Sequence, residues 1–517
     1  MEVLIFPEKE GAGGRFSAVM RFALLFLFSA LVLQAASRPN VLFIFADDQN
    51  YRTVGCYPES WPWVKTPNID ALAKNGVRFH AAYLGSWCMP SRATLLTGRH
   101  PHAIESMSME GQYPGSKYDP AKTPFIPAEM RKSGYHTAQI GKWHTGTDSG
   151  WGRDWDHQIV WNRPKHPENA GAYYETQILS IDGVEKTIEG YPADNYTQWS
   201  LDYIRGKNRD ASKPWYLWLC YGSIHGPSKP AARHLGKYKG SPVEVPADIF
   251  PPREGKPAYL DKMQAWARGE DGYPVTGKGG EKFGEGKKGK RYDEWVHQMN
   301  ECVPAVDEGV GQLIAALKET GQYDNTLIIY TADQGFGMGH HGFRTKLAPY
   351  DANYRSPLIV SMPKRFPSDQ VCATPVNATD LMTTMIAMMG VQAPLAVHGR
   401  DLTPLLENPA MNWPHACLYE HMGNEYGSTT TETIRLRRPQ DHYQGVPMYT
   451  ALVQDGFKLI HYLDGESGEE FYDLKNDPEE LRNVITASEH AKRLTQMREA
   501  LQAELKRTEA GFAEAVK

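Results

Sequence analysis

The chain has 517 residues, of which 41% are hydrophobic and 23% are charged, and its formal net charge at pH 7 is −5. This length allows a large catalytic domain with a smaller one attached, and the composition is that of an ordinary globular protein. The modest charge excludes general binding to nucleic acids or acidic membranes, so any affinity for anions has to come from a local site.

The cysteine pattern excludes two further classes of protein. The six cysteines are widely scattered and form no CxxC pair, which excludes a zinc cluster and a dense disulfide scaffold. One or two disulfides in an oxidising compartment stay open, with no pairing indicated.

An export signal is predicted near the N-terminus. Residues 20–37 combine a basic start at Arg21, an apolar run over 22–33 and small residues for cleavage. The residues before Met20 fit no signal pattern, which makes Met20 a candidate for the true start. The apolar run is too short to span a membrane, and no cysteine follows it to carry a lipid. We therefore expect residues 1–37 to be an export region, and the mature protein to be periplasmic or secreted without a stable membrane span.

Five apolar segments, each closed by polar residues, are predicted to be buried strands. Continuous apolar strands are typical of a sheet that is covered on both faces. Helical patterns lie between them, and one begins with Thr66 as N-cap and Pro67 in the first turn. Strands that alternate with helices predict a doubly wound, mostly parallel α/β sheet between layers of helices. The five segments are 40–49, 136–146, 215–227, 325–335 and 357–363.

The composition changes twice later in the chain. Residues 256–290 are rich in Gly and Lys, which predicts an exposed insertion, either a solvated loop or a basic flap that contacts a polyanionic substrate. Near the C-terminus, the pattern indicates short antiparallel strands and then a helix introduced by Asp477 and Pro478. We therefore predict a catalytic domain at 38–405 and a small α+β subdomain with a short antiparallel sheet at 406–517.

Cys88 stands at the start of a predicted helix, in the stretch CMPSRATLLTG. Pro90 suits a first helical turn and Gly98 suits a C-terminal stop, so Cys88 lies close to unpaired backbone N–H groups and to the positive end of the helix dipole. Such a position is suited to hold an anion.

Acidic side chains close two of the predicted strands, at Asp47 and Asp48 and again at Asp333, which Gln334 follows. One such pair can be a turn former, but two at strand ends indicate a site, because ligands bind beyond the carboxyl ends of parallel strands. Carboxylate and amide oxygens suit Ca²⁺ or Mg²⁺ rather than zinc. We expect one Ca²⁺ in preference to Mg²⁺, because calcium accepts loose geometry and suits an exported protein.

Cationic side chains follow the same strands. Lys142 and His144 share the segment GKWHTG and point to the same side if it is extended. His225 follows a strand in GSIHGP, and His341 and Lys346 lie in GHHGFRTK. Lysines act as point charges and histidines as proton donors or acceptors, so together they indicate a binding site for a tetrahedral oxyanion.

The stretch at Cys88 resembles the modification motif of the formylglycine-dependent (type I) sulfatases, C-x-P-S-R followed by x-x-L-x-T-G. The resemblance implies an alkaline-phosphatase-like fold and an arylsulfatase-like sulfuric-ester hydrolase. It departs from the family at Gln334, where Asn or His is more usual, and at Thr145, where Leu is usual. Further matches cover nearly the whole predicted mature chain in the family's order: NVLFIFADDQ, TPNIDALAKNGVRF, GKWHTG, DNTLIIYTADQG and YDLKNDPEE.

The resemblance implies that Cys88 is oxidised to formylglycine (3-oxoalanine) by a formylglycine-generating enzyme. The aldehyde would be hydrated to a gem-diol that binds the calcium through one oxygen, and Arg92 would steady this group and its developing charge. The other metal ligands implied are Asp47, Asp48, Asp333 and Gln334.

The resemblance also implies roles for the cationic residues. Lys142 and Lys346 would hold sulfate oxygens. His225 would contact the substrate and protonate the leaving alcohol, and His144 would take the remaining diol proton. His341 would be a further substrate-binding residue, preferred over its neighbour because it directly precedes a glycine.

We therefore expect a sulfuric-ester hydrolase that acts on an extracellular sulfate ester, with a sulfated carbohydrate as the favoured substrate. The aromatic-rich stretch 151–164 suits stacking on sugar rings. One alternative is a phosphomonoester or phosphodiester hydrolase of the same superfamily. A second is a non-catalytic glycan-binding relative with unmodified Cys88, and a third is a cysteine hydrolase. The sugar, the sulfate position, endo or exo action and the oligomeric state stay open.

Overall fold

The computed structural model describes residues 38–105, 107–110, 115–277, 289–436 and 443–516. The predicted export region and the most Lys-rich part of the insertion, 278–288, lie outside these residues. Residues 39–517 form one compact unit, and the division of this unit at residue 405 stays a prediction. Among the described residues, none of the helices has both the length and the apolar character that a membrane crossing needs.

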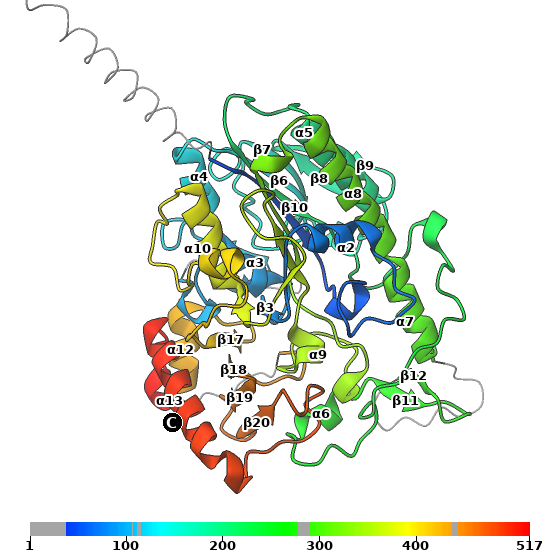
Figure 1. Cartoon of the computed structure of the whole chain (residues 1–517), viewed down its shortest axis with the longest axis vertical. Helices are drawn as coiled ribbons and strands as arrows, with labels where there is room; N and C mark the ends of the chain where they lie inside the picture. The colour runs from blue at the N-terminus through cyan, green and yellow to red at the C-terminus, as the bar shows by residue number, and fades with distance from the viewer. Residues whose placement is uncertain (1–37, 106, 111–114, 278–288, 437–442, 517) are drawn as a thin grey trace, which may run out of the picture. The chain divides into compact units, whose positions relative to one another are not determined.

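A mixed ten-stranded sheet forms the centre of this unit (Figure 1). The strands of the described residues are β1 (Asn40–Ala46), β2 (Val77–Phe79), β3 (Ala82–Tyr83), β4 (Met107–Glu110), β5 (Gly115–Tyr118), β6 (His136–Trp143), β7 (His157–Asn162), β8 (Gln177–Ile181), β9 (Val184–Ile188), β10 (Trp215–Cys220), β11 (Trp266–Arg268), β12 (Pro274–Thr276), β13 (Thr326–Ala332), β14 (Leu358–Ser361), β15 (Gln370–Cys372), β16 (Val376–Asn377), β17 (Cys417–His421), β18 (Tyr449–Gln454), β19 (Phe457–Tyr462) and β20 (Glu469–Asp473). The strand order in the large sheet is β15-β2-β14-β13-β1-β10-β6-β7-β8-β9.

The middle of the sheet is parallel, as predicted. Strands β13, β1, β10, β6 and β7 all run in one direction, whereas β14 and β8 are antiparallel to their inner neighbours. Each of the five predicted segments contains one strand, in the order β1, β6, β10, β13 and β14. Because the carboxyl ends of the parallel strands meet at one edge, polar residues that follow different strands can form one site.

Helices cover both faces of the sheet (Figure 1). Side chains of β1 alternate, so Phe43 and Phe45 pack towards α3 and α10, and Leu42 and Ile44 pack towards α2 and α8. This burial explains the continuous apolar runs of the central strands. The α-helices of the described residues are α2 (Pro67–Lys74), α3 (Cys88–Thr97), α4 (Ile126–Lys132), α5 (Pro192–Ile204), α6 (Tyr259–Lys262), α7 (Tyr292–Glu301), α8 (Val303–Glu319), α9 (Asp351–Tyr354), α10 (Ala378–Met389), α11 (Thr403–Glu407), α12 (Gly427–Arg435) and α13 (Ala491–Arg507).

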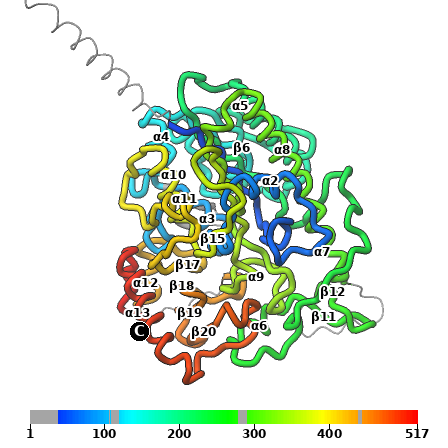
Figure 2. Tube along the Cα trace, in the orientation of Figure 1, coloured from blue at the N-terminus to red at the C-terminus, as the bar shows by residue number. Residues whose placement is uncertain are grey.

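A smaller antiparallel sheet lies near the C-terminus, as predicted. Its strand order is β17-β18-β19-β20, and α13 packs on it (Figure 2). Leu418 and Leu459 from the sheet and Met497 and Leu501 from the helix share one apolar cluster. The small sheet therefore has its own core.

The prediction that Asp477 and Pro478 introduce a helix is wrong. The Asp477 carboxylate accepts a hydrogen bond from the backbone N–H of Arg482 at 2.8 Å and closes a turn. Glu480 has a φ of 55°, which no α-helix allows, and α13 begins only at Ala491. An Asp-Pro pair can start a helix, but here the carboxylate stabilises a turn instead.

The prediction of an exposed insertion at 256–290 is wrong for part of that segment. It contains α6, β11 and β12, and Trp266 is only 1% exposed. Trp266 packs with Ile249 and Tyr292, and its indole N–H donates to the carbonyl of Phe343 at 3.2 Å. Apolar residues between the Gly and Lys runs therefore anchor the described part of the insertion on the rest of the unit.

A buried ion-pair group connects the small sheet to the rest of the unit. Lys458 of β19 lies 2.7 Å from the Glu480 carboxylate and also pairs with Asp351, the first residue of α9. The Asp351 carboxylate accepts a further hydrogen bond from the hydroxyl of Tyr83 at 2.7 Å. Because Arg355 also lies 3.5 Å from Asp351, removal of the ammonium group leaves mainly the buried Glu480 carboxylate without a cationic partner among the described residues.

We predict that Lys458→Met lowers the free energy of unfolding by about 3–5 kcal/mol, because it leaves the buried Glu480 carboxylate without its cation. Urea denaturation followed by circular dichroism measures this change. Lys207→Met is the control: its exposed pair with Asp202 should contribute less than about 1 kcal/mol. Equally small losses in both variants would show that the buried group does not stabilise the fold.

Candidate active site

Two acidic pairs meet at the carboxyl edge of the sheet. Asp47 and Asp48 follow β1, and Asp333 follows β13, the strand paired with β1. One oxygen from each aspartate and the Cys88 Sγ lie within 4.8 Å of one another, and all four residues are buried. Asp48 has a φ of 57°, and its backbone N–H donates to Asp333 Oδ1 at 3.0 Å. The chain turn at Asp48 thus brings the two strand ends together.

Cys88 reaches this cluster from the first position of α3, the helix predicted at that place. Its Sγ lies 3.4 Å from Asp47 Oδ1 and 3.9 Å from Asp48 Oδ1. Trp87 is the N-cap, and Gly98 ends the helix with a φ of 68°, a left-handed conformation that glycine adopts without strain. The whole helix is buried, so the thiol is fixed in place.

Two lysines contact the acidic cluster. Lys142, near the end of β6, forms an ion pair with Asp47, and both side chains are fully buried. Lys346 Nζ lies 2.7 Å from Asp48 Oδ1 and 3.1 Å from Cys88 Sγ. Burial opposes ionisation of Lys346, but the neighbouring charge of Asp48 outweighs it and raises the pKa of Lys346 well above its ordinary value. Both ammonium groups can therefore hold an anion beside Cys88.

Arg92 supplies a third fixed cation, one helical turn after Cys88. Its guanidinium donates to Asp333 Oδ2 at 3.2 Å and to the carbonyl of Lys142 at 3.0 Å, and it lies 5.1 Å from the centre of the Phe45 ring. These contacts tie α3 to the ends of β13 and β6.

His225 is oriented from two sides. Its Nδ1 lies 2.7 Å from the Gly226 carbonyl, which assigns the proton to Nδ1, and its Nε2 lies 3.5 Å from Asp48 Oδ2. Its ring stacks on the ring of Tyr173 at 4.0 Å and 5°. Burial lowers the pKa of His225 to about 3, although Asp48 opposes the shift. The ring is therefore neutral at pH 7 before an anion binds.

His144 follows β6 and lies beside the cluster. Its Nδ1 is 3.5 Å from Nη1 of Arg163, and its ring lies 6.1 Å from the ring of Trp87. Burial, together with the charges of Arg163 and Lys142, lowers the pKa of His144 well below its ordinary value. His144 is thus a neutral ring that can accept a proton.

Burial and neighbouring charges shift the pKa values of the acidic groups in opposite directions. Burial and the charge of Asp47 raise the pKa of the Cys88 thiol to about 12 and that of Asp333 to about 7. Burial also opposes ionisation of Asp47, but the charges of Lys142 and Arg92 outweigh it and hold the pKa of Asp47 well below its usual range. A Cys88 thiol with so high a pKa is a poor nucleophile at neutral pH.

The acidic cluster fits a hard metal ion. Asp47, Asp48 and Asp333 offer carboxylate oxygens at one point, and hard divalent cations bind to such oxygens. The Gln334 side chain donates to Asp48, and its buried Oε1 has no hydrogen-bond partner among the described residues. An amide oxygen in that position is an additional ligand of the same chemical type.

His341 lies apart from this cluster. It is fully buried, its Nδ1 lies 2.6 Å from Asp248 Oδ2, and its ring lies 4.0 Å from the ring of Tyr350. In the part of the chain that the structure describes, no contact joins His341 to Cys88 or to the three aspartates of the cluster. The geometry therefore gives no support to the expectation that His341 binds substrate.

Sequence reasoning missed two residues of the site, Tyr173 and Arg163. Neither belongs to a sequence motif, and only their contacts with His225 and His144 identify them. The aromatic stretch 151–164 is divided: Trp155 and Trp161 are buried in the core, where they pack on other aromatic rings, whereas Trp151 is 41% exposed. Of its tryptophans, only Trp151 is therefore open to a sugar ring.

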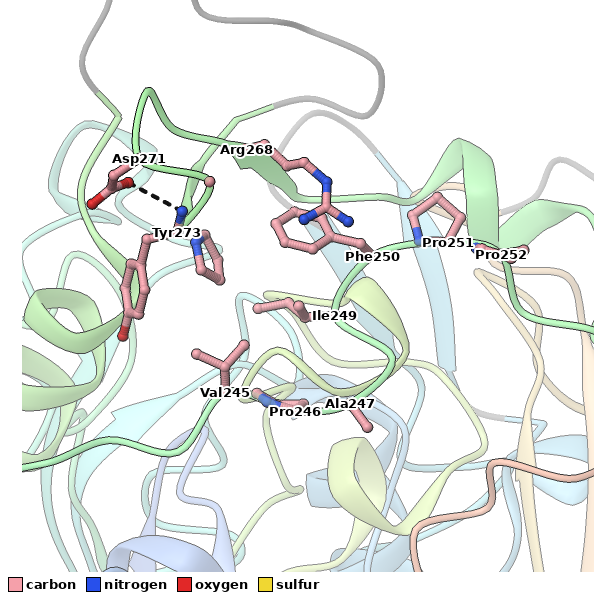
Figure 3. Close-up of a pocket in the computed structure, with 12 residues that line it drawn as sticks. Val245, Pro246, Ala247, Ile249, Phe250, Pro251, Pro252, Arg268, Asp271 and Tyr273 are labelled. Atoms are coloured by element: carbon pink, nitrogen blue, oxygen red, sulfur yellow. Dashed lines mark hydrogen bonds between the residues drawn. The ribbon is translucent and has the colours of Figure 1, made fainter.

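A hollow of about 700 Å³ lies elsewhere, between the 245–252 segment and the β11–β12 hairpin (Figure 3). Arg268 covers the ring of Phe250 at 4.0 Å, and Asp271 accepts a hydrogen bond from the backbone N–H of Tyr273 at 3.1 Å. None of the residues around Cys88 lines this hollow. It is therefore separate from the candidate active site.

Comparison with known proteins adds independent findings. The chain matches the family described as sulfatase over residues 39–391, and the family described as N-sulphoglucosamine sulphohydrolase, C-terminal, over residues 339–507. It is 28% identical to N-acetylglucosamine-6-O-sulfatase of Bacteroides thetaiotaomicron, over 91% of this chain and 86% of that protein. It is 25% identical to an arylsulfatase of Clostridium perfringens, over 92% of this chain and 96% of that protein. A solved structure of a protein with its substrate D-glucosamine-2-N,6-O-disulfate is similar at a TM-score of 0.76 and 25% identity, covering 92% of this chain and 98% of that one.

We predict that Asp47→Asn and Asp333→Asn each weaken calcium binding at least tenfold, about 1.4 kcal/mol, because each removes a charged oxygen ligand. Isothermal titration calorimetry with CaCl₂ on the purified protein measures the affinity. Asp202→Asn changes a half-buried carboxylate on α5 outside the site; it is the control and should bind as the wild type does. Unchanged affinity in both site variants would contradict a metal site at this cluster.

Proposed function

The chain belongs to the sulfatase family, and we propose that it removes sulfate from a sulfated carbohydrate by means of a formylglycine made from Cys88. The main support for this proposal is the set of cationic side chains around Cys88. Lys346 touches both Cys88 and Asp48, while Lys142 and Arg92 contact the adjoining carboxylates. A residue at the start of a buried helix, surrounded by fixed cations, suits attack on an anionic ester.

In the proposed reaction, residue 88 carries two hydroxyl groups after oxidation and hydration. One hydroxyl gives its proton to water as its oxygen attacks sulfur, and the bond between sulfur and the sugar oxygen breaks. The second hydroxyl then loses its proton, the aldehyde forms again, and the carbon–oxygen bond to sulfate breaks. Water restores the hydrate. Serine and cysteine lack the second hydroxyl, which is why the modified residue can release sulfate and they cannot.

The cations position the sulfate in this scheme. Lys142 and Lys346 hold its oxygens as point charges, and Arg92 stabilises the charge that develops near residue 88. Asp47, Asp48, Asp333 and Gln334 would hold a calcium ion. When bound, calcium would polarise the sulfate and neutralise the carboxylates, and its tolerance of loose oxygen geometry favours it over magnesium.

The two histidines divide the proton transfers. His225 donates a proton to the departing sugar oxygen, and His144 accepts the proton from the second hydroxyl of residue 88. His225 is neutral without substrate, since burial lowers its pKa to about 3. The negative sulfate beside the ring favours its protonated form, so we expect His225 to gain its proton together with the substrate.

Two lines of support favour a sugar substrate. One relative is named N-acetylglucosamine-6-O-sulfatase, and a similar solved structure holds D-glucosamine-2-N,6-O-disulfate. Glucosamine 6-O-sulfates are therefore the first substrates to test. We further propose, from the export pattern at 20–37, that the enzyme acts in the periplasm or outside the cell.

A phosphoester hydrolase of the same fold is the second candidate. The Pro-Ser-Arg sequence after Cys88 and the Lys142–His144 pair favour sulfate, as do the names of the relatives. A cysteine hydrolase is disfavoured, because burial and Asp47 raise the pKa of the Cys88 thiol to about 12.

We predict that mass spectrometry of the tryptic peptide from Phe79 to Arg92 shows formylglycine at residue 88 when the chain is made with a formylglycine-generating enzyme. Cys88→Ser should not turn over, because a serine sulfate has no second hydroxyl. Cys56→Ser should keep both the modification and the activity, which makes it the control. An alkylatable thiol at residue 88 in fully active protein would refute the mechanism.

We predict that His225→Ala lowers kcat at least a hundredfold for a sugar sulfate and far less for nitrophenyl sulfate. An aryl oxide leaves with little help from a proton, whereas a sugar alkoxide needs one. His144→Ala should slow both substrates and give a burst of alcohol release without matching sulfate release. Leaving-group dependence in His144→Ala, with none in His225→Ala, would mean that the two roles are exchanged.

A further inference from the structure

Lys346 reaches the site from a segment with little regular structure. Between β13 and α9, the only helical element is the single turn at 340–342, and all of this segment is described. The Lys346 side chain is nevertheless only 11% exposed. Its Nζ lies 3.1 Å from Cys88 Sγ and 2.7 Å from Asp48 Oδ1. Contacts outside the sheet therefore have to set the point from which Lys346 extends.

The turn before Lys346 has a left-handed backbone at a residue with a side chain. Gly339 and Gly342 have φ angles of 94° and 77°, which glycine adopts freely. His341 between them has φ 53° and ψ 22°, in the same left-handed region. A residue with a Cβ stays in this region only where the surrounding structure fixes it.

Asp248 holds both the backbone and the ring of His341. Its Oδ1 accepts a hydrogen bond from the His341 backbone N–H at 2.9 Å, and its Oδ2 lies 2.6 Å from His341 Nδ1. Figure 3 labels Ala247 and Ile249, which flank Asp248 and line the outer hollow. Asp248 is not among the residues that line it; its carboxylate contacts His341 instead.

The turn is joined directly to Lys346. The backbone N–H of Gly339 donates to the Phe343 carbonyl at 3.0 Å, and that of Gly337 donates to the Thr345 carbonyl at 2.8 Å. These bonds connect the two arms of the turn up to the residue before Lys346. The backbone conformation at His341 is therefore coupled to the returning arm that carries Lys346, and Asn353 Nδ2 holds the end of that arm by donating to the Thr345 carbonyl at 3.2 Å.

Other contacts hold the neighbours of His341. The backbone N–H of Ala265 donates to the Gly342 carbonyl at 2.9 Å, and His340 Nε2 lies 2.9 Å from the Glu479 carboxylate. These anchors fix both sides of the turn, whereas Asp248 fixes the left-handed residue itself.

We propose that Asp248 is a positioning residue for Lys346, which acts by holding His341 in its left-handed conformation. The proposal rests on the proposed function in one respect, namely that Lys346 binds the sulfate of the substrate. It assigns His341 to the support of Lys346 rather than to substrate contact.

A double-mutant cycle between Asp248 and Lys346 tests the proposal, with nitrophenyl sulfate as substrate and inorganic sulfate as competitive inhibitor. Asp248→Ala should lower kcat/KM at least tenfold and weaken sulfate inhibition. In a Lys346→Met background, the same substitution should change kcat/KM less than twofold, because the residue it acts through is gone. Asp271→Ala, which removes an exposed carboxylate from the turn between β11 and β12, is the control and should leave kcat/KM unchanged.

An equal loss from Asp248→Ala in both backgrounds would show a general structural role and overturn the proposal. So would an Asp248→Ala variant within twofold of the wild type. A wild-type enzyme without sulfatase activity, although residue 88 is modified, would instead refute the proposed function. The two failures are therefore distinguishable.

If Asp248→Ala does not fold, variants at His341 test whether the left-handed backbone at this residue supports the activity. His341→Gly should keep more kcat/KM than His341→Ala, because glycine adopts the left-handed backbone without support. His341→Gly should also restore part of the activity that Asp248→Ala loses, where that variant is soluble. Equal or better activity in His341→Ala than in His341→Gly would overturn the proposal.

Discussion

The site depends on the balance of charge among buried side chains. Carboxylates that are packed together away from water are costly unless cations neutralise them. In this structure each cation comes from a different element: Lys142 from β6, Arg92 from α3 and Lys346 from the segment after β13. The cations that hold the carboxylates in place are thus the same groups that can attract an anionic ester to Cys88. Any change to one of these charges affects both the fold of the site and its chemistry.

The parallel sheet makes this balance possible. Strands β13, β1, β10 and β6 are neighbours in the sheet. Asp333 follows β13, Asp47 follows β1, His225 lies beyond the end of β10, and Lys142 lies near the end of β6. Each residue lies at or just beyond the carboxyl end of its strand, where the chain is free to turn. The rigid core below needs only apolar residues, so the chemistry is confined to the strand ends and to the helix that begins at Cys88.

The sequence allowed the central sheet and most of the site to be predicted, because both depend on local patterns. Continuous apolar runs identify strands buried on both faces, and the polar residues that end them identify the edge where Asp47 and Asp333 meet. Contacts between residues that are far apart in the sequence could not be predicted from such local patterns. Tyr173 matters through its stacking on His225, and nothing in its neighbouring residues indicates this. The sequence places His341 near Lys346 and the Asp333 strand end, which led to the expectation that it binds substrate, and its contact with Asp248 could not be predicted because Asp248 is far away in the sequence.

The burial of Cys88 imposes an order of events. The thiol is 1% exposed, and every residue of α3 is buried with it. A second protein cannot bind the chain segment around Cys88 once this helix is packed between the sheet and its neighbours. Any enzyme that modifies Cys88 therefore has to meet the chain while it is still extended, during or soon after synthesis. If residue 88 is modified as proposed, maturation and folding compete in time, and a chain that folds first would keep its thiol.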